Sequence, residues 1–189
     1  MDNPQELVYG RLPGFGLTVL GEKQARITGE YLESLKARPE VIITSPLLRT
    51  KTTAKILREF FSGIEIMEEK EIIEVDNSWQ GEKKGELIKR GIWQKYLDYP
   101  SQVTGGEGYE GMQKRVTSWL GRLLGKSGFK ELIVVSHMDV IRAITVFLER
   151  KPLDDLTKIP CAHASVTKVV IDRKMKLLKP VVYWEPNGA

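Results

Sequence analysis

The sequence is poor in cysteine, histidine and long apolar runs, and each shortage excludes a class of protein. A single cysteine, Cys161, excludes an intrachain disulfide and leads us to expect the reducing cytoplasm. One cysteine and two histidines do not provide the ligands of a zinc site, and we expect neither a metal nor a cofactor. Because no apolar run approaches the roughly 20 residues of a membrane helix, we expect no membrane partner.

Charge of one sign is not concentrated anywhere in the chain either. The 189 residues include 29 Lys and Arg against 25 Asp and Glu, which gives a net charge of +4 and a pI of about 9.1. Acids interrupt the basic residues, a pattern typical of a solvated surface rather than of a nucleic-acid interface. We therefore expect no nucleic-acid partner. The G-x-S-x-G and Walker A motifs of other α/β enzymes are also absent.

The sequence does contain an alternation of helix and strand periodicities, which predicts an α/β fold. Its length is sufficient for one domain with a full core over residues 1–189. We expect a three-layer architecture, with a mostly parallel sheet and helices on both faces. The predicted strands are residues 40–45, 64–69 and 131–136, and the predicted helices are 18–38, 46–61, 82–98, 107–126 and 138–149. A final hairpin-like pair of strands is expected to turn at residues 172–174.

Two predicted strands end at polar residues beside the start of a helix. They read IITSPLLRTKTTA, which contains Arg49, and IVVSHMDVIRA, which contains His137. In doubly wound sheets, ligands bind beyond the carboxyl ends of the strands. Free N–H groups at a helix N-terminus also favour an anion there. The sequence therefore predicts a phosphate-sized anion pocket that joins Arg49 and His137.

Each candidate site residue also has a simpler interpretation. His137 stands where a histidine can cap the following helix, and Arg49 stands where a surface arginine is common. An arginine near a helix N-terminus opposes the helix dipole, however, which favours an anion between the two. Glu74, in EIIEVDNSWQG, fits either an ordinary surface acid or the pocket rim. Glu107, in TGGEGYEGM, is most simply a carboxylate that stabilises a helix start.

Other side chains carry weaker signals. His163 leads into a strand without a partner pattern, and we interpret it as structural. Cys161 lies nearby in an apolar setting, where we expect an inert thiol. Residues 76–102 form a rim segment rich in aromatic side chains, which fit either contact with the organic part of a substrate or packing of the rim itself. We favour packing for these residues, Trp79, Trp93, Tyr96 and Tyr99.

Taken in order, four stretches make the chain resemble the histidine phosphatase superfamily, which has the phosphoglycerate-mutase-like fold. YGRLPGFGLTVLGEKQARITGEYL is similar to that family's Gly … Leu-Thr-x-x-Gly-x-x-Gln-Ala segment, and IITSPLLRTKTTAKIL to its Ser-x-Leu-x-Arg-x-x-x-Thr-Ala unit. TGGEGYEGMQKRV resembles its Gly-Gly-Glu-Ser stretch, with Gly108 in place of the serine. IVVSHMDVIRAI resembles its second histidine motif, with Met138 in place of the glycine. The resemblance extends from about residue 3 to residue 170.

The resemblance implies a phosphatase that transfers a phosphoryl group from a small phosphorylated substrate to a histidine and then to water. It implies that His137 is the second pocket histidine and Arg49 the second arginine, which together hold the phosphoryl oxygens. It also implies that Glu74 protonates the leaving group, although the Gly-x-Trp-Glu-Gly run that follows this acid in the family is one residue shorter here. Arg11 and Glu107 are expected at the rim or in support of the pocket.

The family's first motif is a strand that ends Arg-His-Gly and supplies the nucleophile and the first arginine. It belongs just before NPQELVYGRLPG, and we find no such motif in the 189 residues, so we expect the first strand to be missing. His163 lies on the wrong side of His137 in chain order to replace it. A gene start placed at an internal methionine or a genuine truncation would produce this pattern, and we favour the first. Since the loss of a covalent nucleophile can lower kcat by on the order of 10⁶, we expect these residues to be inactive or severely impaired.

Three functions stay open on the sequence alone. The first is a phosphomonoesterase that acts through phosphohistidine, and the second is a non-catalytic relative that binds a phosphorylated ligand. A phosphoglycerate mutase ranks lower, because the short stretch between Glu74 and Glu107 leaves little room for the insertions that mutases would require. The residues specify neither the substrate nor the oligomeric state.

Overall fold

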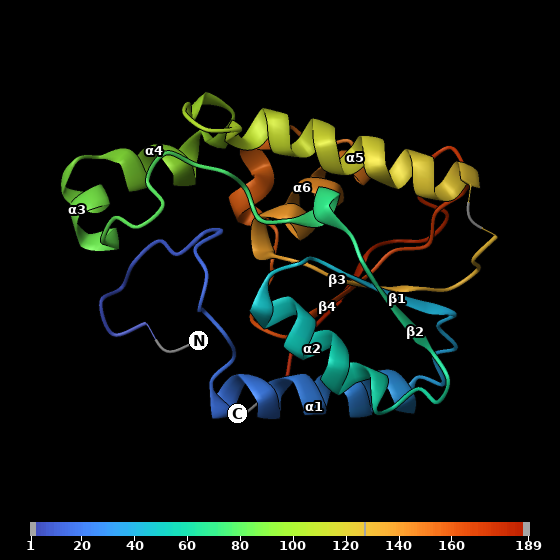
Figure 1. Ribbon diagram of the computed structural model, residues 1–189. Coiled ribbons are helices and arrows are strands. Elements are labelled where there is room, and N and C mark those ends of the chain that lie inside the picture. The colour runs from blue at the N-terminus through green and yellow to red at the C-terminus, as the bar shows by residue number, and fades with distance from the viewer. Residues whose placement is uncertain (1–2, 127, 187–189) are drawn as a thin grey trace.

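A computed structural model describes residues 3–126 and 128–186 of the chain (Figure 1). Its centre is a sheet of three parallel strands in the order β2-β1-β3. These strands are β1 (Val41–Thr44), β2 (Glu65–Glu68) and β3 (Ile133–Val135). All three lie inside the predicted ranges, so the prediction of an α/β fold with a parallel sheet is confirmed.

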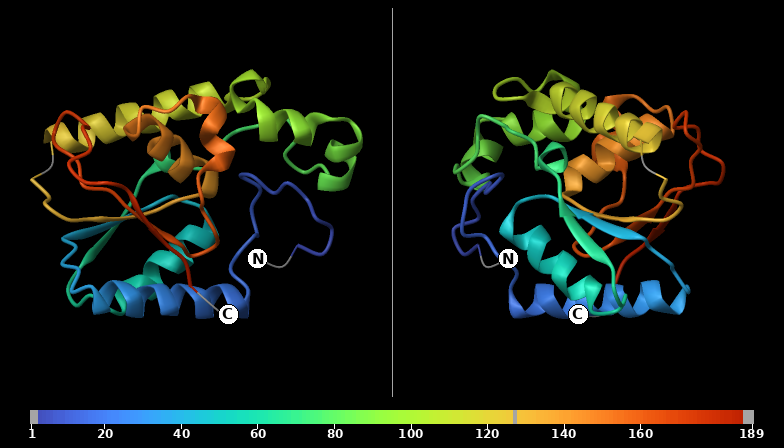
Figure 2. Two further views of the ribbon diagram at one scale, coloured as in Figure 1. Left: turned by 180° about the vertical axis from the view of Figure 1, so that it is seen from behind. Right: turned by 45° about the vertical axis from the view of Figure 1, so that its right-hand side comes forward.

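Helices cover both faces of this sheet, as Figure 2 shows from two further sides. One face carries α1 (Val19–Ser34) and α2 (Leu48–Arg58). The other face carries α5 (Gly108–Lys126) and α6 (Met138–Leu148). The predicted arrangement of helices on both faces of the sheet is therefore confirmed.

The pleat of β1 divides the core between the two faces, because successive side chains of a strand point in opposite directions. Ile42 is buried in a cluster with Ala54 and Leu57 of α2. Val41 and Ile43 are buried in a second, larger cluster that includes residues of α5 and α6. All four residues of β1 are buried, as expected for a central strand covered on both sides.

Local sequence explains where the helices begin and end. Thr18 is the N-cap of α1, and its hydroxyl accepts a hydrogen bond from the Gly21 N–H at 3.1 Å. α1 ends at Ser34 rather than at residue 38, since Lys36 takes the left-handed backbone conformation (φ 56°). In α5, the buried apolar residues include Val116, Trp119 and Leu120, which are spaced at helical intervals.

Two details of the predicted helices are wrong. Pro46 was expected in the first turn of a helix, but α2 begins at Leu48, because the Ser45 N–H bonds to the Val135 carbonyl (3.0 Å) and keeps the chain extended. The predicted helix 82–98 is two short helices, α3 (Lys84–Lys89) and α4 (Ile92–Asp98). Gly91 separates them in the left-handed conformation (φ 72°).

The C-terminal region forms the expected antiparallel pair, β4 (Val166–Lys168) and β5 (Val182–Trp184), which is a separate two-stranded sheet. The chain reverses at Asp172, whose carbonyl accepts from the Met175 N–H at 3.0 Å. Three short 3₁₀ helices complete the described elements: η1 (Lys70–Ile72), η2 (Pro100–Gln102) and η3 (Leu153–Lys158). No helix among the described residues is long and apolar enough to span a membrane.

The sheet topology brings the two predicted strand tips together. β1 and β3 are parallel neighbours, with Thr44 opposite Val135. Their carboxyl ends therefore lie at the same edge of the sheet. Beyond this edge the chain enters α2, which carries Arg49 in its first turn, and α6, which follows His137 directly.

Candidate functional site

His137 and Arg49 meet in a buried pocket at this edge. Nη2 of Arg49 lies 3.0 Å from Nδ1 of His137, and Oγ of Ser45 lies 2.7 Å from Nε2 of the same ring. Arg49 is 7% exposed and His137 is 5% exposed. His137 occupies the N-cap position of α6, but its side chain makes no capping hydrogen bond. The simpler interpretations, a helix cap for His137 and a surface position for Arg49, therefore do not describe these side chains.

These contacts fix the protonation of His137. An arginine carries only donors, so Nδ1 of His137 accepts from Arg49, and the ring proton lies on Nε2, which donates to Ser45. Burial lowers the pKa of His137 to about 2, together with the positive charges of Arg49, Arg11 and Arg115. The imidazole is therefore neutral near pH 7.

Glu74 is the third side chain at the pocket. Its Oε2 lies 3.8 Å from Nδ1 of His137, and its Oε1 accepts from the Val75 N–H at 2.9 Å. Because the imidazole is neutral, the contact with His137 is not an ion pair. Burial and the nearby charge of Asp139 raise the pKa of Glu74 to about 8, against the opposing effects of the Val75 hydrogen bond and two arginines. Glu74 therefore holds a proton near pH 7, as a general acid must.

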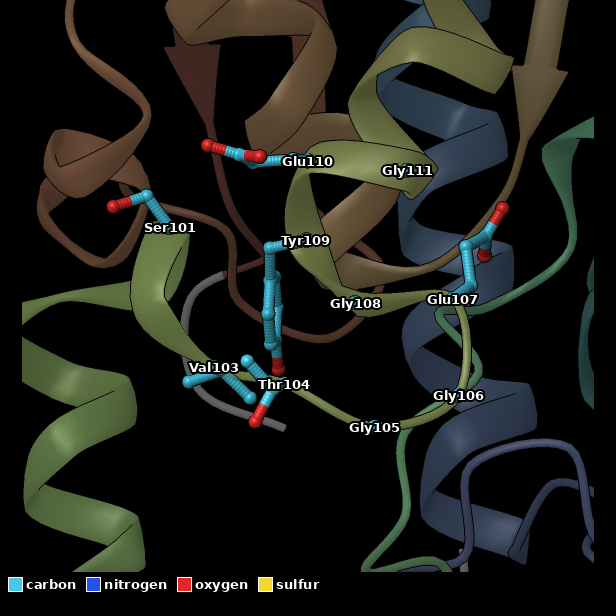
Figure 3. A pocket seen from close by; sticks show the side chains of 10 residues that line it. All are labelled: Ser101, Val103, Thr104, Gly105, Gly106, Glu107, Gly108, Tyr109, Glu110 and Gly111. Atoms are coloured by element: carbon cyan, nitrogen blue, oxygen red, sulfur yellow. The ribbon is translucent and has the colours of Figure 1, made fainter.

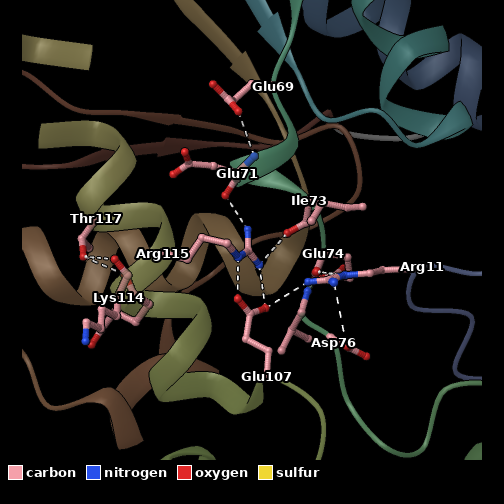
Figure 4. Close-up of polar contacts among 12 residues, drawn as sticks. Arg11, Glu69, Glu71, Ile73, Glu74, Asp76, Glu107, Lys114, Arg115 and Thr117 are labelled. Atoms are coloured by element: carbon pink, nitrogen blue, oxygen red, sulfur yellow. Dashed lines mark hydrogen bonds and ion pairs between the residues drawn. The ribbon is translucent and has the colours of Figure 1, made fainter. Parts of the chain in front are cut away.

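Arg11 connects the Glu74 backbone to Glu107 (Figure 4). Its Nε donates to the Glu74 carbonyl at 2.7 Å, and its Nη2 donates to the Glu107 carboxylate at 3.0 Å. Its Nη1 lies 3.9 Å from a carboxylate oxygen of Asp76. The charge of Arg11 is thus largely balanced by acids, and its closest contact to the pocket is the main chain of Glu74.

Arg115 of α5 holds Glu107 from the other side (Figure 4). Its Nε and Nη2 donate to the two carboxylate oxygens at 2.5 and 2.8 Å, and the same guanidinium donates to the carbonyls of Glu71 and Ile73. Burial raises the pKa of Glu107, but the hydrogen bond and charge of Arg115 outweigh it and lower that pKa. Glu107 lies one residue before α5, so the carboxylate expected to stabilise a helix start instead joins two guanidinium groups.

The N-terminal segment covers Arg49. The Gly10 carbonyl accepts from Arg49 Nη2 at 2.8 Å, and the Arg49 guanidinium carbon lies 5.1 Å from the centroid of the Tyr9 ring. Gln80 accepts from the Arg11 N–H, and its Oε1 would lie 2.5 Å from a Cβ added at Gly10, which has a φ of 41°. The positive φ at position 10 therefore favours glycine.

Two cavities accompany these side chains. One of about 260 Å³ opens beside Arg49, between the N-terminal segment and the start of α2. Its lining includes three cations and several apolar side chains: Arg11, Arg49, Lys51, Leu12, Phe15, Leu47 and Leu48. The other, of about 280 Å³, lies along residues 103–111 and Ser101, and contains Glu107 and Tyr109 in its lining (Figure 3). Arg49 therefore lines the first cavity, and Glu107 lines the second.

Several residues singled out in the sequence lie outside the pocket. His163 is exposed in the turn before β4, which does not fit the structural role expected of it. Burial raises the pKa of the Cys161 thiol, as expected for an unreactive cysteine. Trp79 and Tyr96 are buried and pack edge to face with ring centroids 5.8 Å apart, so packing is confirmed for them. Tyr99, by contrast, is 52% exposed.

Sequence reasoning did not single out three residues that shape the site. Ser45 directly follows β1 and fixes the His137 tautomer, and its place at a strand tip was the available signal. Arg115 and Asp139 contact partners distant in the sequence, so no local pattern marks them. Within residues 3–126 and 128–186, no group of three or more His, Cys, Asp or Glu side chains could hold a metal ion.

This arrangement is suited to a tetrahedral oxyanion. A guanidinium offers fixed N–H donors that match phosphate geometry, and the N-termini of α2 and α6 meet at the same edge of the sheet. Beside them stands a neutral carboxylic acid, which can supply a proton to a leaving oxygen. The guanidinium, the N-termini of the two helices and the neutral carboxylic acid together favour the chemistry of phosphate esters.

Comparison with known sequences agrees with this chemistry. The sequence model of the histidine phosphatase superfamily (branch 1) matches residues 2–182. An uncharacterized protein of Mycobacterium tuberculosis is 30% identical over 190 residues, which cover 97% of this chain and 91% of that protein. Phosphoserine phosphatase 1 of Hydrogenobacter thermophilus is 26% identical over 167 residues, which cover 86% of this chain and 78% of that one.

Solved structures show the same fold. A mycobacterial glucosyl-3-phosphoglycerate phosphatase matches with a TM-score of 0.82 at 21% identity, over 97% of this chain and 92% of that chain. The α-ribazole phosphatase from Shigella flexneri matches with a TM-score of 0.77 at 18% identity, over 93% and 87% of the two chains. Since the family model spans nearly all of the sequence, the chain belongs to the histidine phosphatase superfamily (branch 1).

Proposed function

We propose that the pocket of Arg49, His137 and Glu74 binds the phosphoryl group of a small phosphomonoester. The observation that carries this proposal is the 3.0 Å contact between Arg49 and His137, with Glu74 3.8 Å from the same ring. Within the described part of the chain, Arg49 forms its hydrogen bonds through Nη2, so Nε and Nη1 are available to phosphoryl oxygens. Phosphoryl transfer asks a protein mainly for positioning and for positive charge around these oxygens.

The reaction that the family resemblance implies for such a site is phosphoryl transfer through phosphohistidine. A histidine nitrogen attacks phosphorus, the bond from phosphorus to the ester oxygen breaks, and the departing oxygen takes the proton of Glu74. Water then attacks the phosphorus of the phosphohistidine, the bond from phosphorus to nitrogen breaks, and the Glu74 carboxylate takes a proton from the water as inorganic phosphate leaves. The raised pKa of Glu74 supports its part, because the carboxyl starts the reaction protonated.

We also propose that these 189 residues bind such esters with little turnover. His137 engages both ring nitrogens, with Ser45 and Arg49, which leaves neither nitrogen free to act as a nucleophile. The other histidine of the sequence, His163, is exposed in the turn before β4. The resemblance assigns the nucleophile to an Arg-His-Gly motif that we do not find in the sequence.

The binding proposal is tested by thermal unfolding with phosphoserine or inorganic phosphate. A ligand at 100 times its Kd stabilises the folded state by roughly 2.7 kcal/mol, which corresponds to about 5–10 °C in Tm for a chain of this length. Arg49→Ala should remove the shift. Arg58→Ala is a matched control, because Arg58 is an exposed arginine at the end of the same helix, and it should keep the shift. Equal shifts in both variants would refute the pocket assignment.

Turnover is tested separately with p-nitrophenyl phosphate and with phosphoglycerate. We expect a ligand-induced rise in Tm without steady hydrolysis or isomerisation of either ester. Binding without any acid-labile phosphoprotein would favour the alternative of a non-catalytic phospho-ligand-binding relative. Steady release of phosphate by the 189 residues, lost in Glu74→Gln, would show that they contain a working nucleophile and would contradict the proposed lack of turnover. Interconversion of phosphoglycerates would instead favour the mutase.

A further inference from the structure

Asp139 is a buried carboxylate that the proposed reaction does not use. It lies in the first turn of α6, two residues after His137, and is 7% exposed. Its Oδ1 accepts a hydrogen bond from the Tyr96 hydroxyl at 2.9 Å, and its Oδ2 accepts one from the Tyr109 hydroxyl at 3.2 Å. Nη1 of Arg142 lies 3.9 Å from Oδ1. Each oxygen of this carboxylate therefore has a donor.

The two hydroxyl donors belong to elements that surround the pocket. Tyr96 lies on α4, in the aromatic rim segment, and Tyr109 lies in the first turn of α5, next to Glu107. Their rings pack with centroids 5.3 Å apart. Burial and the charge of Asp139 raise the pKa of both tyrosines, so both hydroxyls keep their protons and donate. Asp139 thus ties α4 and α5 to the start of the helix that follows His137.

Asp139 and Glu74 are two buried carboxyl groups in different environments. Burial raises the pKa of each. Asp139 accepts from two hydroxyl groups and lies near a guanidinium, which favour its ionised form, whereas Glu74 accepts one hydrogen bond from the Val75 N–H. When two such groups interact, the proton stays on the one whose anion is less stabilised. That group is Glu74.

We propose that Asp139 is a positioning residue of the phosphoryl pocket, which anchors α4 and α5 at the start of α6 and, through its buried negative charge, keeps the proton on Glu74 for the leaving group. This inference rests on the proposed function in one respect only, namely that the Glu74 proton goes to the leaving group. The linkage between the two carboxyl groups can be measured without any ligand.

The remaining charged and titratable groups around the pair come from every element packed against it. The arginines favour the ionised forms of the two carboxyl groups. The tyrosines and the thiol are neutral at pH 7. These groups are Tyr9, Arg11, Arg49, Tyr96, Tyr109, Arg115, His137, Arg142 and Cys161. None of them changes in the variants compared below, so a change in the Glu74 titration reports on Asp139.

The test is an NMR titration of the Glu74 carboxyl carbon between pH 5 and pH 10, with the signal assigned by its loss in Glu74→Gln. Wild-type Glu74 should titrate near pH 8. In Asp139→Asn, which keeps the shape and removes the charge, the midpoint should fall by about one pH unit, as expected for the loss of a nearby like charge. Asp98→Asn, an exposed change on α4, is the control and should leave the midpoint in place.

An unchanged Glu74 midpoint in a folded Asp139→Asn variant would overturn the proposal, because a purely structural role would leave that midpoint untouched. Should that variant fail to fold, Asp139→Ser removes the same charge and keeps a hydroxyl oxygen that can accept from a tyrosine. It should lower the Glu74 midpoint by a similar amount, and no fall would again overturn the proposal. Failure of the proposed function looks different. In that case phosphate would not raise the Tm of the wild type, while the Glu74 midpoint would still respond to Asp139.

Discussion

The polar contacts of the pocket converge on the neutral imidazole of His137. It accepts from Arg49 at Nδ1 and donates to Ser45 at Nε2, and all three side chains are buried. A buried donor or acceptor left without a partner costs about 1–3 kcal/mol. The stability of the pocket therefore depends on small side chains as well as on the charged ones.

Ser45→Ala should lower the free energy of unfolding by about 1–3 kcal/mol, because it leaves the Nε2 proton of His137 buried without its acceptor. Urea denaturation at pH 7 measures this loss. Ser34→Ala is the matched control, since the Ser34 hydroxyl bonds to the Tyr31 carbonyl at an exposed site, and its effect should stay within about 0.5 kcal/mol. Equal losses in the two variants would mean that the hydrogen bond to His137 contributes nothing.

At the residue scale, sequence reasoning located side chains that follow a local rule. Arg49 and His137 lie just past the ends of buried strands, so the rule for doubly wound sheets placed them at one edge, where they are found together. Asp139 follows no such rule. Its partners Tyr96 and Tyr109 are 43 and 30 positions away in the sequence, so their contacts depend on the packing of three helices.

At the scale of elements, the packing of α1 against the turn that follows α2 depends on a glycine. A Cβ added at Gly29 would lie 2.3 Å from Cδ2 of Phe60, a distance that real Cβ atoms do not show. The close approach of α1 to this turn therefore requires the absence of a side chain at position 29.

Gly29→Ala should destabilise the protein by about 1–3 kcal/mol, because the displaced Phe60 ring costs more than the roughly 1 kcal/mol gained in helix propensity. Gly125→Ala, in the last turn of α5, meets nothing within 4 Å and should be neutral or slightly stabilising. Thermal unfolding of both variants gives the comparison. A rise in Tm for Gly29→Ala would show that Phe60 moves aside without cost.

The positions of elements were predictable where the hydrophobic periodicity of the sequence was strong. They were less predictable where the backbone conformation of one residue determined the end of a helix. The strand and helix cores were found, and α5 agrees with its prediction to within one residue. The break at Gly91 and the early end of α1 at Lys36 both depend on left-handed backbone conformations. Only one of these two residues is a glycine, so the residue type alone indicated the break at Gly91 but not the end of α1 at Lys36.

At the scale of the whole molecule, alternating elements predicted a parallel sheet but not its strand order. The order β2-β1-β3 places β1, which is buried on both faces, between its two neighbours. The central place of β1 depends on its burying the most apolar surface. Because β3 is its neighbour, the tips of β1 and β3 form the pocket. Comparison of whole sequences, rather than local patterns, identifies such an arrangement.

The two perturbed groups of the pocket also shape the stability of the whole molecule. Burial raises the pKa of Glu74 from 4.5 to about 8, so the native state keeps a proton that the unfolded chain loses, and stability falls as pH rises through this range. The pKa of His137 is lowered from 6.5 to about 2. Below pH 6.5 the unfolded chain therefore binds a proton that the native state does not bind, and stability falls as the pH drops. The two contributions balance between about pH 4.5 and 6.5.

Above that plateau, the Glu74 contribution should reduce the free energy of unfolding by about 1.4 kcal/mol per pH unit, or about 2 kcal/mol between pH 6.5 and 8. Urea denaturation across this range should therefore show the stability of Glu74→Gln rising relative to that of the wild type by this amount, because the amide cannot ionise. Glu30→Gln, at an exposed position of α1, should give a curve parallel to the wild type. A stability difference between Glu74→Gln and the wild type that stays constant with pH would show that Glu74 ionises freely in the folded protein, and it could not then serve as the proton donor.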